Sequence, residues 1–361
     1  MVIGILAEAE LPIVSMVPDT AARLKKAGHR ILIEKGAGSA AGFPDRLYAE
    51  VAELKTRAEL LAESDILLSV QVPTSTDLAQ IRPEATLITN TEIFAYPDSL
   101  KVFEGYAFRV LSMDEIPRTS LAQSMDVLSS MASLSGYRAV LEASTLFTRY
   151  FPMMITAAGS IKPAKVLVLG AGVAGLQAIA TAKRLGAQVE AFDVRSAVKE
   201  EVQSLGARFV EVPGAKEDGG AGGYAVEQSA DYLARQKEEV QRRAVQSDIV
   251  IATAQIRGKR APLLITEETI QAMRPGSVVV DLAASTGGNC AFTQDGKCIE
   301  VNGVHILGNS RLAYSMRQDA SLLYGNNVYH FLTHYLKQAE QNALMHDEIC
   351  RAVCVYPKSE S

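Results

Sequence analysis

Three glycines and an acid near the middle of the chain have the spacing that dinucleotide binding requires. Gly170, Gly172 and Gly175 form a G-x-G-x-x-G pattern, and Asp193 follows at the expected interval of about 20 residues. The first glycine permits a tight turn, the second lets the backbone approach a pyrophosphate, and the third lets a helix pack closely on a strand. An acid in this position accepts hydrogen bonds from the adenosine ribose. The pattern predicts an NAD site; the alternative is a glycine turn that serves only helix packing.

The segments around these residues predict the elements that would position them. The aliphatic run 166–169 is too short for a helix and is typical of a buried parallel strand, the helical pattern 173–185 stops at Gly186, and a second strand covers 188–192. The free N–H groups at the start of the helix would bind the pyrophosphate. Arg195 leaves NADP as an alternative cofactor, because an arginine here can accommodate a 2′-phosphate. The candidate cofactor-binding residues of this unit are Gly170, Gly172, Val173, Ala174, Gly175, Asp193, Val194 and Arg195.

Composition is that of a soluble globular protein with two domains. The chain has 361 residues, of which 48% are hydrophobic and 21% charged. A net charge of -5 without a basic stripe argues against nucleic-acid binding. No apolar run reaches the roughly 18 residues of a membrane span, and the apolar start has no basic leader, so it is predicted to be a strand. Four cysteines suit a reducing cytosol. We expect a cytoplasmic chain with no span of its own.

The cysteines and histidines near the C-terminus are not predicted to hold a metal. His346, Cys350 and Cys354 have helical spacing, but the segment 348–356 alternates like a strand, which favours buried free thiols. His330 and His334 are predicted to lie on the surface of a helix.

The rest of the chain predicts an α/β protein with two doubly wound Rossmann-like domains joined by long helices. Strands and helices alternate up to Ser112, including predicted helices at 45–63 and 99–106; a polar loop and a long helix follow, and the last helix, 322–336, returns to the first domain. The first domain is therefore discontinuous, with residues 1–125 and 310–361, and residues 126–309 form the NAD(H)-binding domain. The cleft between the domains is the expected ligand site. The glycine-rich stretch 214–224 is either a lid that places Tyr224 over the cofactor or a solvated linker.

Four stretches resemble the NAD(H)-binding component, domain I, of proton-translocating nicotinamide nucleotide transhydrogenases, a family that includes alanine dehydrogenase. They are PRTSLAQSMDVLSS (117–130), the segment 152–187, AGGYA (221–225) and PGSVVVDLAASTGGNC (275–290). The segment 152–187 runs from PMMITAAGS through the G-x-G-x-x-G pattern, the glycine fingerprint. The resemblance implies an oxidoreductase subunit of Re/Si-specific type that passes a hydride from NADH to NADP⁺ held on a partner subunit, coupled to proton translocation. It also implies a homodimer, membrane and NADP(H)-binding partner subunits, and a place beside the inner membrane through those partners.

The resemblance also implies roles for individual residues. Arg118, Gln123, Asp126 and Ser129 map onto the catalytic loop beside the nicotinamide, where Gln and Ser can donate to or accept from a carboxamide. The alternative is a capping cluster, in which Ser124 or Asp126 starts the long helix. Further residues that the resemblance assigns to the cofactor site are Tyr224 in a loop that closes over it, Thr253, Ala254, Gly288 and Asn289.

Departures from the alanine dehydrogenase branch favour transhydrogenation. That branch uses an Arg, a Lys, a His and an Asp for its substrate, where this chain has AEAELPIVSMV, LLSVQVP, TNTE and Ser285; the segment SRLAYSM after Asn309 is also unusual. Reduction of a keto or imino acid needs a general acid, whereas hydride transfer between two nicotinamides needs placement, with the reacting carbons about 3–3.5 Å apart. Neither 118–135 nor 285–290 contains His or Lys. The remaining alternatives are an NAD-dependent amino or keto acid dehydrogenase and a non-catalytic NAD-binding module.

Overall fold

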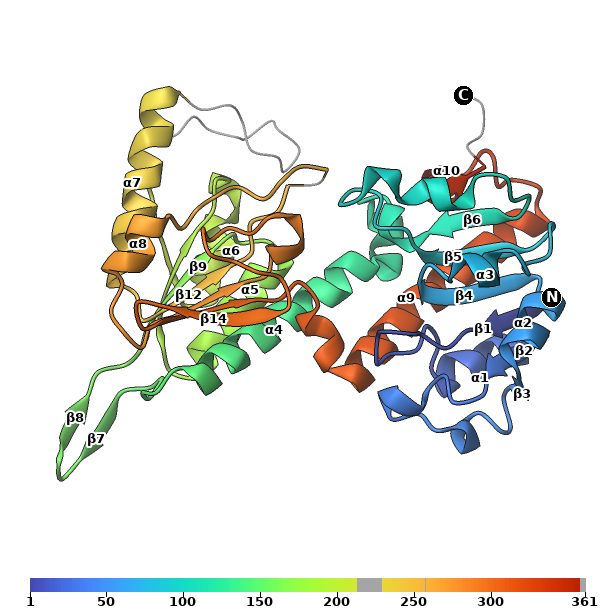
Figure 1. Cartoon of the computed structure of the whole chain (residues 1–361), viewed down its shortest axis with the longest axis horizontal. Helices are drawn as coiled ribbons and strands as arrows, with labels where there is room; N and C mark the ends of the chain where they lie inside the picture. Colours follow the sequence, from blue (N-terminus) through green and yellow to red (C-terminus); the bar gives the residue numbers. More distant parts are fainter. Residues whose placement is uncertain (213–228, 257, 358–361) are drawn as a thin grey trace. The chain divides into compact units, whose positions relative to one another are not determined.

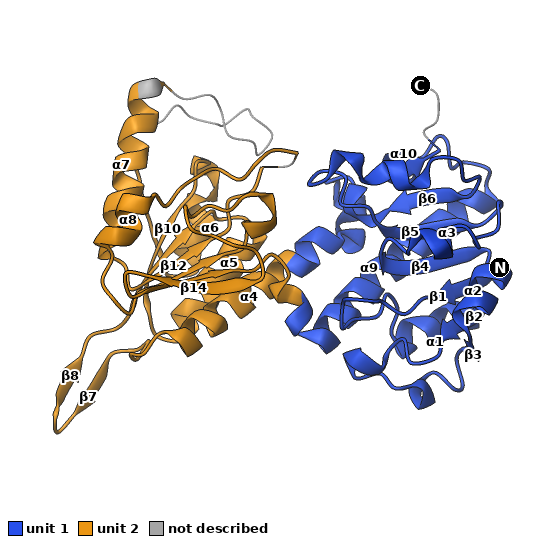
Figure 2. Cartoon of the chain, viewed as in Figure 1, with its two compact units in different colours: residues 1–131, 314–361 blue, residues 132–313 orange. Residues whose placement is uncertain are grey.

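The chain forms two compact units. The structure is a computed structural model that describes residues 1–212, 229–256 and 258–357. Unit 1 contains residues 1–131 and the chain from 314 onward, and unit 2 contains residues 132–313 (Figure 2). Along the chain the units change over at 131/132 and 313/314, a few residues beyond the predicted domain boundaries at 125/126 and 309/310.

Unit 1 is built on a seven-stranded sheet with the order β16-β6-β5-β4-β1-β2-β3. All neighbouring strands are parallel except β16, which runs antiparallel to β6. The strands are β1 (Val2–Ile5), β2 (Arg30–Glu34), β3 (Glu53–Lys55), β4 (Ile66–Gln71), β5 (Thr86–Asn90), β6 (Arg109–Ser112) and β16 (Cys354–Tyr356). The helices are α1 (Pro18–Lys26), α2 (Arg57–Glu63), α3 (Ser75–Leu78), α9 (Arg317–Glu340) and α10 (Glu348–Val353).

Unit 2 also has a seven-stranded sheet, with the order β11-β10-β9-β12-β13-β15-β14. Only β14 is antiparallel to its neighbour. The strands are β9 (Lys165–Leu169), β10 (Gln188–Phe192), β11 (Arg208–Phe209), β12 (Ile249–Ala252), β13 (Val278–Asp281), β14 (Lys297–Val301) and β15 (Val304–Gly308). The helices are α5 (Val173–Arg184), α6 (Lys199–Ser204), α7 (Ala230–Gln246) and α8 (Glu267–Ala272), and α4 (Val127–Leu146) continues into this unit from unit 1.

Alternation along β9 explains why the sheet of unit 2 is covered on both faces. Val166 and Val168 join the core cluster that α4 and α5 cover, whereas Leu167 and Leu169 join the cluster that includes Tyr232 and other residues of α7. Strands buried on both faces read as continuous aliphatic runs, which is why β9, β12 and β13 stand out in the sequence. The predicted α/β class with two Rossmann-like sheets is confirmed.

Several predicted elements are wrong in detail. The segment 45–63 is not one helix but a 3₁₀ turn (Asp45–Leu47), β3 and α2, because Thr56 and Glu59 form a capping box that starts α2 at Arg57. The segment 99–106 is 3₁₀ from Pro97 to Phe103.

The predicted strand at 348–356 is also largely wrong. It begins with the helix α10, since Asp347 accepts the N–H of Cys350 and caps it, and only the last three residues form β16. His334 does not lie on a helix surface, because its side chain is only 14% exposed and bonds Asp347.

The hairpin of β7 (Met154–Thr156) and β8 (Gly159–Ile161) is an element that the sequence patterns did not reveal. It extends away from the sheet of unit 2 (Figure 1). Ile155 is 74% exposed and Met153, just before the hairpin, 62%. No helix among the described residues is long and apolar enough to span a bilayer.

Candidate dinucleotide-binding site

The strand order of unit 2 reverses direction between β9 and β12. Successive strands run outward from β9 to β11 on one side, and from β12 toward β15 on the other. In open α/β sheets, ligands bind beyond the carboxyl ends of the strands at such a reversal. Thr253, just after β12, donates its hydroxyl hydrogen bond there to the carbonyls of Leu169 (3.2 Å) and Gly170 (3.1 Å). The glycine turn and Thr253 therefore lie together at the reversal.

Each glycine of the fingerprint has its own backbone reason. Gly170 has a φ of +98°, a conformation that side chains rarely adopt. A Cβ on Gly175 would lie 1.9 Å from the carbonyl oxygen of Gly170, so only glycine lets α5 approach β9 this closely. A Cβ on Gly172 would meet no atom within 4 Å. Gly172 thus leaves the backbone open on the side where a ligand would approach.

The N-terminus of α5 offers the groups that an anion needs. Gly172 is the N-cap and has no side chain to satisfy the helix, and the N–H groups of the first turn have no partner within the helix. Val173 is 45% exposed, and Ala174 is partly exposed. A pyrophosphate fits this end, because free N–H groups and the helix dipole both favour negative charge.

α4 packs against this end of α5 in unit 2. A Cβ on Gly136 would lie 2.0 Å from the carbonyl oxygen of Ala174, so the two helices touch backbone to backbone. Gly136 lies in the segment 135–140, SGYRAV, whose pattern did not reveal this packing role.

Asp193 follows β10 and is already engaged on both carboxylate oxygens. Oδ2 accepts the N–H of Ala171 at 2.7 Å, and Oδ1 accepts the N–H of Arg195 at 2.8 Å. The guanidinium of Arg195 bonds both oxygens, at 3.0 Å each. The carboxylate is therefore fixed beside the glycine turn and paired with a cation, while the intervening Val194 is 49% exposed.

Asn289 joins the loops that follow β12 and β13. Its side-chain oxygen accepts the N–H of Ala254 at 3.0 Å, and its amide donates to the carbonyls of Ala254 (2.9 Å) and Pro262 (2.8 Å). Asn289 is fully buried, so its amide holds these two loops together from inside the protein. Gly288, with a φ of +75°, provides the turn.

Asp281, which the sequence analysis did not single out, holds the same turn. It lies at the end of β13 and accepts hydrogen bonds from the N–H groups of Ala283, Asn289 and Cys290 and from the hydroxyl of Thr293. Burial raises the pKa of Asp281, and the four hydrogen bonds oppose that effect. An acid at the carboxyl end of a hydrophobic strand was the available signal.

The four residues of the predicted catalytic loop lie in unit 1. Asp126 caps α4: its carboxylate accepts the N–H of Ser129 at 2.9 Å and the hydroxyl of Ser129 at 2.6 Å. The capping alternative therefore describes Asp126 and Ser129, and no hydrogen bond joins Asp126 to Arg118. Arg118 and Gln123 are exposed, and neither side chain has a hydrogen bond or ion pair with the described residues. Tyr224 lies outside the described residues.

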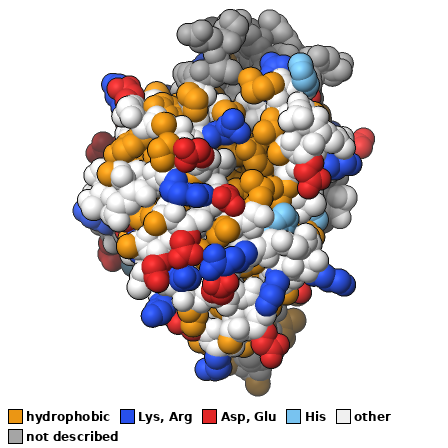
Figure 3. Space-filling model, turned by 90° about the vertical axis from the view of Figure 1, so that its right-hand side faces the viewer, with side chains coloured by type: hydrophobic (Ala, Val, Ile, Leu, Met, Phe, Trp, Pro, Cys, Tyr) orange, Lys and Arg blue, Asp and Glu red, His pale blue; other side chains and the backbone are white. Residues whose placement is uncertain are grey.

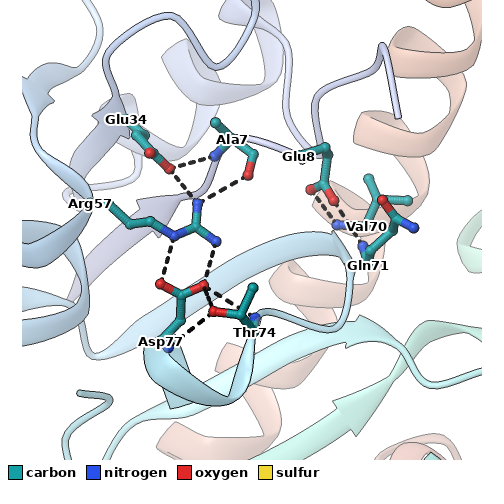
Figure 4. A network of polar contacts seen from close by, with 8 residues as sticks. All are labelled: Ala7, Glu8, Glu34, Arg57, Val70, Gln71, Thr74 and Asp77. Carbon is teal, nitrogen blue, oxygen red and sulfur yellow. Dashed lines mark hydrogen bonds and ion pairs between the residues drawn. The ribbon is translucent and has the colours of Figure 1, made fainter. Parts of the chain in front are cut away.

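A polar network in unit 1 was missed by the sequence analysis (Figure 4). Arg57, the first residue of α2, bonds both oxygens of Asp77 (2.9 and 3.0 Å), one oxygen of Glu34 (2.8 Å) and the carbonyl of Ala7 (3.1 Å). Basic and acidic residues from three separate segments meet here, which no local spacing could indicate.

Glu8 lies beside this network at the carboxyl ends of the central strands. It accepts the N–H groups of Val70 (2.6 Å) and Gln71 (2.9 Å). Burial raises the pKa of Glu8 to about 7, against the lowering effect of the two N–H donors and of Arg57.

A cavity of about 380 Å³ lies at the other end of the sheet of unit 2. It is lined by Lys165, Lys183, Arg208 and Arg243, among others, near the starts of β9 and β10. Ligands of this fold bind at the carboxyl ends of the strands, so this cavity is separate from the candidate dinucleotide site.

Acidic and basic side chains are interspersed on the face shown in Figure 3. This pattern differs from the continuous basic surface of a nucleic-acid-binding protein.

The reversed strand order and the glycine turn after β9 are those of a Rossmann-type α/β fold. Family models support this class: the N-terminal domain of "Alanine dehydrogenase/PNT" matches residues 4–135, and its C-terminal domain matches residues 139–360. The chain belongs to the alanine dehydrogenase/PNT family.

Within this family, the chain is more similar to the transhydrogenase subunits than to the alanine dehydrogenase reported below. The chain is 44% identical to the NAD(P) transhydrogenase subunit alpha of Haemophilus influenzae, covering 96% of this chain and 68% of that protein. It is 41% identical to an NAD(P) transhydrogenase subunit alpha protein of Rhodospirillum rubrum, covering 95% and 92%. The alanine dehydrogenase of Bacillus subtilis is 24% identical over 76% of this chain and 68% of that protein. The solved transhydrogenase of Sinorhizobium meliloti superposes with a TM-score of 0.89 at 39% identity, covering 98% of each chain.

Proposed function

We propose that this chain is the NAD(H)-binding subunit of a proton-translocating transhydrogenase, and that it delivers a hydride from NADH to NADP⁺ held by a partner subunit. The observation that carries the proposal is the 41–44% identity to transhydrogenase alpha subunits, combined with a complete fingerprint at the strand reversal of unit 2. Bound nicotinamide supplies the hydride chemistry.

The residues of unit 2 suit NAD(H) in particular. The open N-terminus of α5 would hold the pyrophosphate, and the fixed carboxylate of Asp193 would accept the ribose hydroxyls. Thr253, Ala254 and Asn289 would line the same edge of the sheet. The proposal assigns Arg118, Gln123, Asp126 and Ser129 to the nicotinamide end, where Gln123 can bond the carboxamide because its own amide has no partner among the described residues.

The partners follow from the same proposal. Membrane and NADP(H)-binding subunits would complete the assembly and hold this chain beside the inner membrane on the cytoplasmic side.

A second copy of this chain would complete a homodimer. The hairpin β7–β8 supports this partner, because it extends from unit 2 and exposes Ile155 (74%) and Ile161 (37%), which a second copy would bury. Sedimentation equilibrium of the wild type and of Ile155→Asp tests this: we expect a dimer that the substitution weakens, and a monomeric wild type would contradict it.

A two-part assay separates this function from the alternatives. The purified chain alone with NADH, pyruvate and ammonium should show no turnover, and clear turnover would establish an amino acid dehydrogenase instead. After addition of an NADP(H)-binding partner subunit, transfer from NADH to an NADP⁺ analogue should appear. NADH binding without transfer would favour the non-catalytic module. Gln123→Asn should lower the transfer rate far more than the affinity for NADH.

A further inference from the structure

Three side chains of different chemistry meet in unit 1, far along the chain from the fingerprint. They are His334 in α9, Asp347 at the N-cap of α10 and Cys350 in the first turn of α10, and their donor atoms all lie within 4.8 Å of one another. We propose that His334, Asp347 and Cys350 form a site for one Zn²⁺ ion, with the imidazole, one carboxylate oxygen and the thiolate as its three protein ligands.

The chemistry of the donors points to zinc. Nitrogen, oxygen and sulfur ligands bind Zn²⁺ at about 2.0–2.3 Å in a tetrahedron, which places donors roughly 3.3–3.8 Å apart. Nε2 of His334 and Oδ2 of Asp347 are already 3.0 Å apart, so small rotations of the three side chains are enough. A thiolate ligand disfavours Mg²⁺ and Ca²⁺, and the charges of Asp347 and the Cys350 thiolate neutralise a divalent ion.

The surrounding backbone holds the three residues in place. The N–H of Asp347 bonds the carbonyl of Ala343 at 3.0 Å, and Oδ1 of Asp347 accepts the N–H of Cys350 at 2.8 Å. One oxygen of Asp347 therefore caps α10 while the other faces His334. The Cys350 thiol also hydrogen-bonds the Asp347 carboxylate, so the three donor groups already meet in one cluster.

The exposure of the three side chains fits a site with one open position. Cys350 is buried, whereas the side chains of His334 and Asp347 remain 14% and 16% exposed, so an ion and a water ligand can enter from that side.

The inferred ion would join α9 to α10 and the edge strand β16, and it does not depend on the dinucleotide site. Cobalt(II) is the probe, because a Co²⁺–thiolate bond gives a charge-transfer absorption in the near ultraviolet. We expect the full chain to bind one Co²⁺ with this absorption, Zn²⁺ to displace it, and Zn²⁺ to raise the melting temperature until a chelator is added.

Matched variants make the test specific. Cys350→Ser should abolish the charge-transfer absorption, while Cys298→Ser, which removes the exposed thiol of β14, should leave it unchanged. His334→Gln and Asp347→Asn should each weaken binding at least tenfold; asparagine preserves the helix cap, so the folded state is retained. The proposal is overturned if the absorption persists in Cys350→Ser, or if Cys354→Ser abolishes it instead. It is also overturned if His334→Gln binds Co²⁺ as tightly as the wild type, or if the wild type binds no Co²⁺.

Discussion

Arg195 pairs with Asp193 through two hydrogen bonds of 3.0 Å, from Nε to Oδ1 and from Nη2 to Oδ2. The acid that should repel a 2′-phosphate therefore has its charge offset by a cation two residues along the chain. This pairing bears directly on the choice between NAD(H) and NADP(H).

Arg195→Gln should sharpen the discrimination against NADPH. Loss of the guanidinium leaves the Asp193 carboxylate unneutralised, so the affinity for NADPH relative to NADH should fall about tenfold, or about 1.4 kcal/mol. Fluorescence titration with each reduced cofactor measures this ratio. Arg184→Gln makes the same charge change at the far end of α5 and should alter neither affinity. Tighter NADPH binding in Arg195→Gln would instead make Arg195 an obstacle to the 2′-phosphate.

A comparison of Gly172→Ala with Gly175→Ala should separate an effect on NADH binding from an effect on folding. A Cβ at Gly172 meets nothing within 4 Å, so only the weaker N-cap should lower the free energy of unfolding, by at most about 1 kcal/mol, but the methyl group would keep the pyrophosphate away and lower NADH affinity. A Cβ at Gly175 would collide with the carbonyl of Gly170 and should destabilise the fold by about 3 kcal/mol. Urea unfolding and NADH titration of both variants check this, and equal stability losses would contradict the assignment.

Glu8 should make stability fall with rising pH. In the folded protein the pKa of Glu8 is about 7, against an ordinary value of 4.5, so the folded state holds a proton that the unfolded chain has released. This group's contribution is therefore most favourable below about pH 4.5 and decreases as pH rises to about 7, by up to about 3 kcal/mol. Glu8→Gln should remove this decrease.

Urea unfolding of wild type and Glu8→Gln at pH 5 and pH 8 measures the difference. The control is Glu50→Gln, on an exposed side chain, which should follow the wild type. Parallel behaviour of all three proteins would show that Glu8 is ionised in the folded state.

Arg57→Ala should destabilise unit 1 by about 3 kcal/mol, because it leaves the partly buried carboxylates of Glu34 and Asp77 without their cation. Arg30→Ala is the matched control: its pairs with Glu53 and Glu63 lie at the surface and are screened by solvent, so its loss should lower stability much less. Thermal unfolding compares the two variants. Similar losses would mean that the network of Figure 4 contributes no more than a surface pair.

Local sequence patterns predicted the strand, glycine turn and helix of the dinucleotide-binding motif, because each of these features lies within a short stretch of the chain. The strand β9, the helix α5 and the glycines that turn between them are all readable from neighbouring residues. The fold class followed from the alternation of such units.

Features that depend on distant contacts were not predictable in this way. The pairing of Arg57 with Glu34 and Asp77 joins three segments, and the position of Gly136 against Ala174 depends on two helices that are far apart in the chain. The helix α10 was missed because its apolar residues alternate, whereas its cap at Asp347 decides its structure. The roles of Arg118 and Gln123 stay predictions.

The hydrogen bonds of Asn289 have a consequence for motion. Its side chain bonds Ala254 and Pro262, and its backbone carbonyl accepts the N–H groups of Leu264 and Ile265. Asn289 therefore connects the segments that follow β12 and β13, and neither segment can move away without breaking hydrogen bonds of this one residue. Their amide protons should exchange with solvent as a single cooperative group, and this edge of the sheet would present a preformed wall to an arriving ligand.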